Sequence, residues 1–339
     1  MIAVILSILA ASLIASAGVT ALAWRAGVLD MPNARSSHGA PTPRAGGLGV
    51  MAGLGAGALA ASAFALSGGP LAGLLILAAA FAVMGFADDL ITLGEAGKFL
   101  ASVFLCIAVA AMAGPVTHIP LDGDIALGLP LWLGWAGSAL FVFVAVNAVN
   151  FMDGSDGMFP AVMIPASLGL AVAGLVTGVN ASVIIGFALA AGLAGFAAFN
   201  WPPAKVFAGD VGALGAGAAY AGGALALAGQ GVPGSMWLAP LFILVFLADV
   251  LLTLLRRARY GRFSLMAHRE HAYQRLIDAG WSHRRVALAY GGLSVLIVVS
   301  GLAAAQGPDI APFLVFWGWT AILTVLHMLA GRLALGSQS

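Results

Sequence analysis

Charge and cysteine are scarce in this sequence of 339 residues, and both shortages limit what the protein can be. Only 8% of the residues are charged, whereas a soluble domain carries about 25%, so an ordinary soluble domain is excluded. The single cysteine, Cys106, excludes an intrachain disulfide, and its apolar surroundings predict a small buried side chain. The N-terminal apolar run lacks a basic flank and is too long for a signal peptide, which predicts a retained first span.

Apolar residues take the place of the missing charge. They make up 62% of the sequence, and 46 glycines accompany them, which is typical of closely packed membrane helices. A helix needs about 20 apolar residues to cross a bilayer, so the chain has room for roughly ten or eleven spans. We therefore predict an all-α polytopic membrane protein that forms one domain over residues 1–339. The eleven predicted spans are 2–24, 47–67, 70–88, 98–113, 129–149, 158–178, 180–199, 212–229, 236–256, 286–305 and 311–331.

The basic residues determine the orientation that we predict for these spans. All 14 lysines and arginines fall in loops or at the terminal residue of a span, and the eleven spans place them all on the same side. Basic loops stay in the cytoplasm, so we predict an inner-membrane protein with its N-terminus outside and its C-terminus inside. The longest basic loop, residues 257–285, carries the segment "HREHAYQR". One missed or added span would scatter the basic residues over both faces, which supports the predicted count.

Five carboxylates are expected to meet on this cytoplasmic face. "GFADDL" holds an adjacent pair, "NAVNFMDGSDGM" holds two beside two asparagines, and "AGDVG" holds the fifth. Unpaired carboxylates at a bilayer edge are costly, so several together require cations. Mg²⁺ is usually held by one or two carboxylates and substrate phosphates, with Mn²⁺ as the alternative metal. The competing interpretation is that these side chains cap helices. The five carboxylates are Asp88, Asp89, Asp153, Asp156 and Asp210.

Aromatic, amide and basic side chains accompany the carboxylates. Phe207 and Asn200 lie three and ten residues before Asp210, and a ring and an amide beside a metal–phosphate site could hold a nucleobase. Simple packing is the alternative for the ring. Lys98 and Arg44 could neutralise phosphates, although the cytoplasmic position of basic loops already explains most of the arginines.

The two histidines of "HREH", His268 and His271, lie three residues apart and could share one face of a helix. Their spacing is not that of the H-E-x-x-H zinc motif, and no cysteine lies near them. We therefore favour phosphate contact over a zinc site, with a polar interfacial helix as the alternative.

Five segments, taken in this order, resemble the polyprenyl-phosphate N-acetylhexosamine-1-phosphate transferases, the membrane family that includes the phospho-MurNAc-pentapeptide translocase. The resemblance extends from about residue 30 to residue 276, and it implies a fold of ten or eleven helices, Mg²⁺ dependence and an inner-face active site. It also implies transfer of a sugar 1-phosphate from a UDP-sugar to a polyprenyl phosphate, with release of UMP. The segments are "PNARSSHGAPTPRAGG", "GFADDL" with Lys98 downstream, "NAVNFMDGSDG", "FNWPPAKVFAGDVG" and "HREHAYQR".

The resemblance implies roles for single residues as well. The adjacent aspartates match the acidic pair of the family, Phe207 matches a ring that stacks on uracil, and the histidines match a motif at the diphosphate. The expected catalytic residues are Asp88, Asp89, Lys98, His268 and His271. The expected substrate contacts are Arg44, Asn147, Asn150, Asp153, Asp156, Asn200, Phe207, Arg269 and Tyr273, and the expected metal ligands are Asp210 and Asp153.

The histidine segment departs from the translocase branch, which carries a longer loop with three consecutive histidines. "HREHAYQR" resembles instead the branch that initiates O-antigen or other surface polysaccharides, as in lipopolysaccharide biosynthesis. This branch favours a 6-deoxy donor such as UDP-QuiNAc or UDP-FucNAc over UDP-GlcNAc, which remains the alternative. We expect Arg269 and Tyr273 to influence the choice of sugar. Undecaprenyl phosphate and membrane lipids are the expected partners, together with a possible second copy of the chain and no nucleic acid.

Two questions stay open at this point. The lipid phosphate is expected to attack the phosphorus bonded to the sugar directly, with a covalent aspartyl-phosphate as the alternative. The rival class is a transporter or flippase, because eleven spans would suit one. Such proteins place charged or broken helices at the bilayer midplane and show internal repeats. Asp249 is the one mid-span charge of this kind, and no internal repeat is present, so we favour the enzyme.

Overall fold

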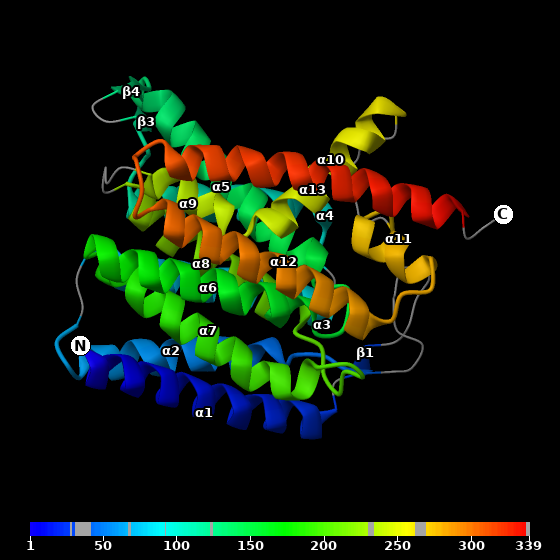
Figure 1. The fold of residues 1–339 in the computed structure, drawn as a ribbon. Coiled ribbons are helices and arrows are strands. Elements are labelled where there is room, and N and C mark those ends of the chain that lie inside the picture. The colour runs from blue at the N-terminus through cyan, green and yellow to red at the C-terminus, as the bar shows by residue number, and fades with distance from the viewer. Residues whose placement is uncertain are drawn as a thin grey trace.

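Long apolar helices form most of the protein in the computed structural model, which describes residues 1–27, 29–30, 42–66, 69–91, 93–122, 125–229, 234–261 and 269–336. Consecutive long helices run in alternating directions (Figure 1), and several of them, such as α1 with α2 and α6 with α7, pack side by side. The helices are α1 (Ile2–Ala26), α2 (Gly47–Ser62), α3 (Leu71–Ile91), α4 (Glu95–Ala113), α5 (Leu131–Met152), α6 (Met158–Thr177), α7 (Asn180–Asn200), α8 (Gly209–Ala228), α9 (Ser235–Leu241), α10 (Leu244–Arg259), α11 (Ala272–Asp278), α12 (His283–Ala304) and α13 (Ala311–Gly336).

The prediction of an all-α polytopic membrane protein is confirmed. Within the described residues, nine helices are long and apolar enough to cross a membrane, or ten if the bent pair α9 and α10 forms one span. Each of the eleven predicted ranges coincides with a helix or with this pair. Helix α2 has only 16 residues, fewer than the roughly 20 that a span requires. The count of eleven and the outside N-terminus therefore stay predictions.

The predicted span 236–256 needs a correction, because the chain breaks inside it. Helices α9 and α10 meet at an angle of 68°. Pro240 lies inside the short α9, and a proline removes a backbone donor and obstructs the preceding helical turn. The residues at the break, Phe242 and Ile243, are fully buried. As a result, α10 points away from the common axis of the other long helices, at the upper right of Figure 1.

Two short antiparallel strand pairs lie at opposite ends of the bundle (Figure 1). Strands β1 (Leu29–Asp30) and β2 (Thr42–Pro43) pair near the beginning of α2. Strands β3 (His118–Asp122) and β4 (Ile125–Gly128) pair between α4 and α5, with a register shift between Pro120 and Asp122. The connection between the predicted spans 98–113 and 129–149 therefore contains an antiparallel strand pair.

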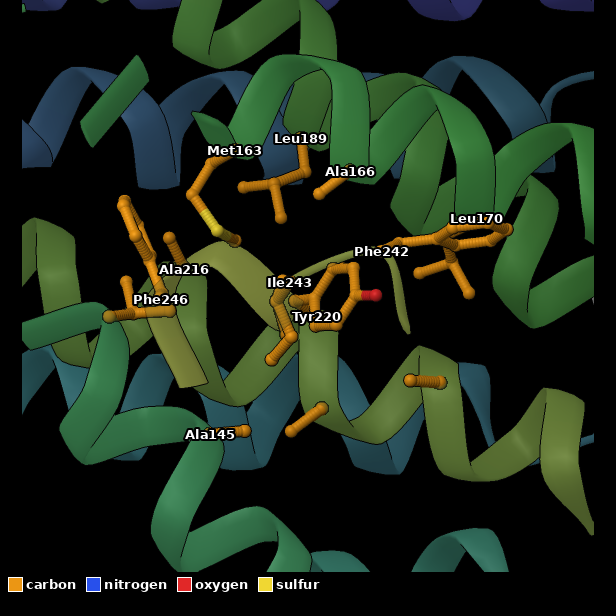
Figure 2. Packing of buried hydrophobic residues seen from close by; sticks show 14 of the residues in the cluster. Ala145, Met163, Ala166, Leu170, Leu189, Ala216, Tyr220, Phe242, Ile243 and Phe246 are labelled. Carbon is orange, nitrogen blue, oxygen red and sulfur yellow. The ribbon is translucent and has the colours of Figure 1, made fainter. Parts of the chain in front are cut away.

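Helix α8 is the centre of the bundle, and all of its residues from Val211 to Ala228 are buried. Its many glycines and alanines let neighbouring helices approach closely. Tyr220 is its largest buried side chain and lies among Phe242, Ile243 and residues of α6 and α7 (Figure 2). The hydroxyl of Tyr220 donates to the Ala239 carbonyl over 2.9 Å, which ties α8 to α9. A helix fixed in this way holds Asp210, in its first turn, at a defined position.

Candidate active site

One end of the bundle gathers the segments predicted to carry the site. Helices α3, α5 and α7 end there, and α4, α6 and α8 begin there, because neighbouring helices alternate in direction. Helix α11 and strand β1 lie at the same end, on the right of Figure 1. The sequence therefore predicted correctly which loops lie together.

Lys98 joins two carboxylates from different helices. Its ammonium group donates to Asp88 Oδ2 and, over 2.7 Å, to Asp210 Oδ2. The second oxygen of Asp88 accepts the Leu93 N–H at 2.8 Å, in the connection between α3 and α4. The side chains of Lys98 and Asp210 remain 28% and 26% exposed. Substrate can therefore reach the charged groups from solvent.

Asp89 is held by a second cation beside this pair. Arg44 donates to Asp89 Oδ1 at 3.2 Å, and the Val211 N–H donates to Oδ2 at 3.4 Å. Gly209 lies directly against the same carboxylate with φ of +69°, and a Cβ atom there would lie 2.6 Å from Asp89 Oδ2. Only glycine suits this conformation and this contact. The beginning of α8 is thus shaped around Asp89.

The acidic turn, residues 153–157, connects α5 to α6 and lies near this charged group. Asp156 Oδ2 accepts the Ala204 N–H at 3.0 Å. Asn200 accepts the Gly157 N–H and donates to the Val206 carbonyl, both over 3.0 Å. The side chain of Asn200 is 2% exposed, so both ends of its amide are used to connect the turn to the loop after α7. Its expected contact with a nucleobase stays a prediction.

Negative charge is in excess around Asp153. Burial raises the pKa of this carboxyl well above its usual value, and the carboxylates of Asp210, Asp89 and Asp156 raise it further. The two nearby cations, Lys98 and Arg44, already pair with other aspartates. A divalent cation bound beside Asp153 and Asp210 would relieve this repulsion. In the part of the chain that the structure describes, no group of three His, Cys, Asp or Glu side chains could hold a metal alone.

The remaining expected substrate contacts are Phe207, in the connection between α7 and α8, and Asn147 and Asn150, on α5. Phe207 is partly buried, and its backbone pairs with the Pro43 carbonyl and the Gly46 N–H at 2.8 and 2.9 Å. These bonds bring the loop after α7 against the segment that carries Arg44. Asn147 donates to a carbonyl one turn earlier in α5, at 2.8 Å, and Asn150 lies partly buried in the last turn of that helix.

The histidine segment lies under the acidic turn. His271 and Tyr273 are buried, at 3% and 1% exposure, and their rings stack at 6.0 Å. The Tyr273 hydroxyl donates to the Phe151 carbonyl over 3.3 Å, and burial raises the pKa of this hydroxyl. Arg269 pairs with Asp278 of α11 at 2.8 Å. His268 lies outside the described residues. The predicted influence of Arg269 and Tyr273 on the sugar stays a prediction.

The contacts of His283 were not predicted from the sequence. Its Nδ1 atom lies 3.0 Å from the Ser155 hydroxyl and accepts the Asp156 N–H at 3.2 Å. His283 therefore holds the acidic turn from the first residue of α12. The two partners lie more than 120 residues apart, and no local motif joins them.

The structure therefore combines a bundle of apolar helices, long enough to cross a membrane, with cation-bridged carboxylates at one end. Comparison with known proteins identifies the family. A profile for glycosyl transferase family 4 matches residues 71–228. The decaprenyl-phosphate N-acetylglucosaminephosphotransferase of Mycobacterium tuberculosis is 32% identical over 325 residues, which covers 86% of this chain and 79% of the relative.

Two further relatives come from other bacteria. The phospho-N-acetylmuramoyl-pentapeptide-transferase of Desulforudis audaxviator is 32% identical over 267 residues, covering 70% of this chain and 76% of that protein. A probable undecaprenyl-phosphate N-acetylglucosaminyl 1-phosphate transferase of Bacillus subtilis is 27% identical over 290 residues, covering 84% and 79%. The chain belongs to the polyprenyl-phosphate N-acetylhexosamine-1-phosphate transferase family.

Proposed function

We propose that this protein transfers an N-acetylhexosamine 1-phosphate from a UDP-sugar to undecaprenyl phosphate at the cytoplasmic face of the inner membrane, releasing UMP. The carboxylate cluster around Lys98 is the observation that carries the proposal. It lies at one end of the helices, where a soluble nucleotide sugar and the headgroup of a membrane lipid can meet. Relatives named for phosphosugar transfer to polyprenyl phosphates support the same reaction.

The residues present fit a bound Mg²⁺ ion. Mg²⁺ typically takes one or two carboxylates and completes its shell with waters and substrate phosphates. Asp210 and Asp153 would hold it, since the negative charge around Asp153 has no cation of its own. The ion would supply positive charge that neutralises the diphosphate of the donor.

We favour direct displacement for the chemical step. A phosphate monoester has a second pKa near 6, so the acceptor is largely ionised at neutral pH and needs little help from a base. An acceptor oxygen forms a bond to the phosphorus that carries the sugar, while the bond from that phosphorus to the UMP oxygen breaks. Lys98 and Arg44 lie where they can spread the charge of the phosphates.

The contacts of the acidic pair support this choice over a covalent intermediate. Asp88 accepts from Lys98 and from the Leu93 N–H, and Asp89 accepts from Arg44 and from the Val211 N–H. A carboxylate whose two oxygens both accept hydrogen bonds is a weak nucleophile. We therefore assign this pair to orienting Lys98, Arg44 and the acceptor phosphate.

The identity of the donor sugar is the most specific part of the proposal. Relatives from Mycobacterium tuberculosis and Bacillus subtilis are named for N-acetylglucosamine, which favours UDP-GlcNAc over the 6-deoxy sugars that the histidine segment suggested. A role in O-antigen initiation rests on that segment alone. We take UDP-GlcNAc as the first donor to test and UDP-QuiNAc and UDP-FucNAc as its competitors.

The test is UMP release by purified protein in detergent with undecaprenyl phosphate and Mg²⁺. UDP-GlcNAc, UDP-GalNAc, UDP-QuiNAc and UDP-FucNAc are compared at equal concentration. We expect release that depends on both the lipid and the metal. If none of the four donors led to UMP release, the proposed reaction would be overturned, and a transporter would become the favoured class of protein. Exchange of labelled UMP into the UDP-sugar without lipid would overturn direct displacement.

A further inference from the structure

Asp249 is a buried carboxylate that the proposed reaction does not use. It lies in the second turn of α10, after the break, and is 4% exposed. His271 Nδ1 and His327 Nδ1 lie 3.4 and 4.0 Å from its Oδ1 atom. A charged group in such a place is costly unless donors compensate it. The contacts of Asp249 therefore indicate what keeps it there.

Four donors satisfy the two oxygens of Asp249. Oδ1 accepts from the Ala272 N–H at 2.8 Å and from the hydroxyl of Thr253 at 3.2 Å. Oδ2 accepts from the hydroxyl of Tyr290 at 2.6 Å and from the Tyr273 N–H at 3.2 Å. The two N–H groups belong to the first turn of α11, where a helix has no acceptors of its own. Asp249 thus caps α11 from another helix.

Helix α11 also contacts the acidic turn. Tyr273 lies in the first turn of α11, and its hydroxyl bonds to the carbonyl of Phe151, two residues before Asp153. The same hydroxyl lies against Gly154 so closely that a Cβ atom there would be 2.0 Å away. The ring of His271 packs on Phe151 as well, at 6.1 Å. The backbone at the beginning of α11 thus contacts Asp249, while the side chain of Tyr273 contacts the acidic turn and the residue Phe151 before it.

We propose that Asp249 is a positioning residue that seats Tyr273 beneath the acidic turn, residues 153–157, and so fixes the groups that receive the nucleotide sugar. The inference rests on the proposed function, because that function gives Asp153 of this turn to the ion that would neutralise the donor diphosphate. The bent α10 brings Asp249 to the histidine segment. The contact network Asp249–Tyr273–Phe151 then links a helix in the membrane to the donor side of the site.

The test compares Asp249→Asn, Tyr273→Phe and the double variant with wild type. We expect Asp249→Asn to raise the KM for the UDP-sugar, and the Kd for UMP measured by calorimetry, by about 10-fold or more, since outer contacts of this kind are worth 10- to 100-fold. The KM for undecaprenyl phosphate stays within about twofold. The double variant should lose no more than the larger single loss, because both changes interrupt the same network.

Thr253→Val is the matched control. It also removes a donor to Asp249, but Thr253 lies on α10 itself and has no bond to α11. We expect its donor KM and UMP affinity to stay at the wild-type values. General loosening of the bundle would instead change the kinetics of both substrates in all these variants.

Tyr290→Phe keeps the proposal testable if Asp249→Asn does not fold. It removes one donor from the same oxygen that holds the Tyr273 N–H, and we expect a smaller rise in donor KM with an unchanged acceptor KM. Unchanged UMP affinity in both variants, or losses that multiply with Tyr273→Phe, would overturn the positioning role. An inactive wild type would overturn the proposed function, whereas an active wild type with multiplying losses overturns only the role of Asp249.

Discussion

The carboxylates around Lys98 and the carboxylate of Asp249 differ in how completely the protein itself compensates their negative charge. Asp88, Asp89 and Asp210 share two cations, Asp88 and Asp210 remain partly exposed, and the carboxylates of Asp210 and Asp89 raise the pKa of the neighbouring Asp153. Asp249 has four hydrogen-bond donors and almost no exposure. The difference teaches that unsatisfied charge, rather than the number of acidic residues, marks the part of this protein that awaits a ligand.

The largest expected effect is at Asp210, on the accessible side of this comparison. Asp210→Asn keeps the shape of the side chain but removes the charge that Lys98 and the metal require. We expect activity to fall about 1,000-fold, or roughly 4 kcal/mol of transition-state stabilisation. The variant should still insert into the membrane and be purified in detergent as a folded protein. Initial rates of UMP release measure the loss of activity.

Asp309→Asn is the control for this change, because it makes the same substitution in the connection between α12 and α13. Its rate should equal that of wild type. Retention of more than about a tenth of the activity by Asp210→Asn, a loss below 1.4 kcal/mol, would remove Asp210 from the centre of the site.

Lys98→Gln comes next, because it removes the cation that two carboxylates share. We expect kcat/KM to fall about 100-fold, since each charge-assisted bond contributes roughly 1.5–3 kcal/mol. Steady-state kinetics with both substrates check the loss. Lys205→Gln, an exposed lysine over the Trp24 ring, should have little effect. Equal losses at the two lysines would show that net charge, not position, matters.

A third prediction concerns pH and sharpens the contrast at Asp153. The raised pKa means that this carboxyl keeps its proton to a higher pH than an ordinary aspartate, and Mg²⁺ must displace that proton. Mg²⁺ affinity should therefore increase as pH rises, by up to about tenfold per pH unit, until the carboxyl is ionised in the free protein, and then level off. Calorimetry in two buffers of different ionisation enthalpy measures the released proton.

Asp153→Asn is the matched variant for this experiment, and it should abolish the dependence of Mg²⁺ affinity on pH in the same range. Binding without proton release in the wild type, at a pH where affinity still rises, would contradict the assignment of the titrating group to Asp153.

The smallest effect on the reaction is expected at Asn200, a buried side chain that is saturated like Asp249. Asn200→Ala leaves the Gly157 N–H and the Val206 carbonyl without their partner, which costs about 1–3 kcal/mol for each buried group. We expect a lower thermal midpoint in detergent, with kcat reduced less than at Asp210 or Lys98. Asn180→Ala, at the other end of α7, is the control. A lost UMP affinity with an unchanged midpoint would make Asn200 a nucleobase contact instead of a brace.

The long helices were predictable because each depends on a local property, an apolar run of sufficient length bounded by polar residues. The convergence of Asp88, Asp153 and Asp210 followed from the alternating direction of those helices. The break between α9 and α10 was missed, although Pro240 lay in the run, because prolines are tolerated in membrane helices whose neighbours satisfy the freed groups. The contacts of Asp249 and His283 could not be predicted, since they join residues that only the packed bundle brings together.

The central claim is that the accessible carboxylates, and not the buried one, carry the transfer reaction. The most direct measurement follows both products at once, UMP by chromatography and the sugar-labelled lipid by extraction and mass spectrometry, for wild type and Asp210→Asn. We predict equimolar UMP and undecaprenyl diphosphate-sugar from wild type, and neither product above background from the variant. UMP without the lipid product from wild type, or equal yields of both products from the two proteins, would contradict the account.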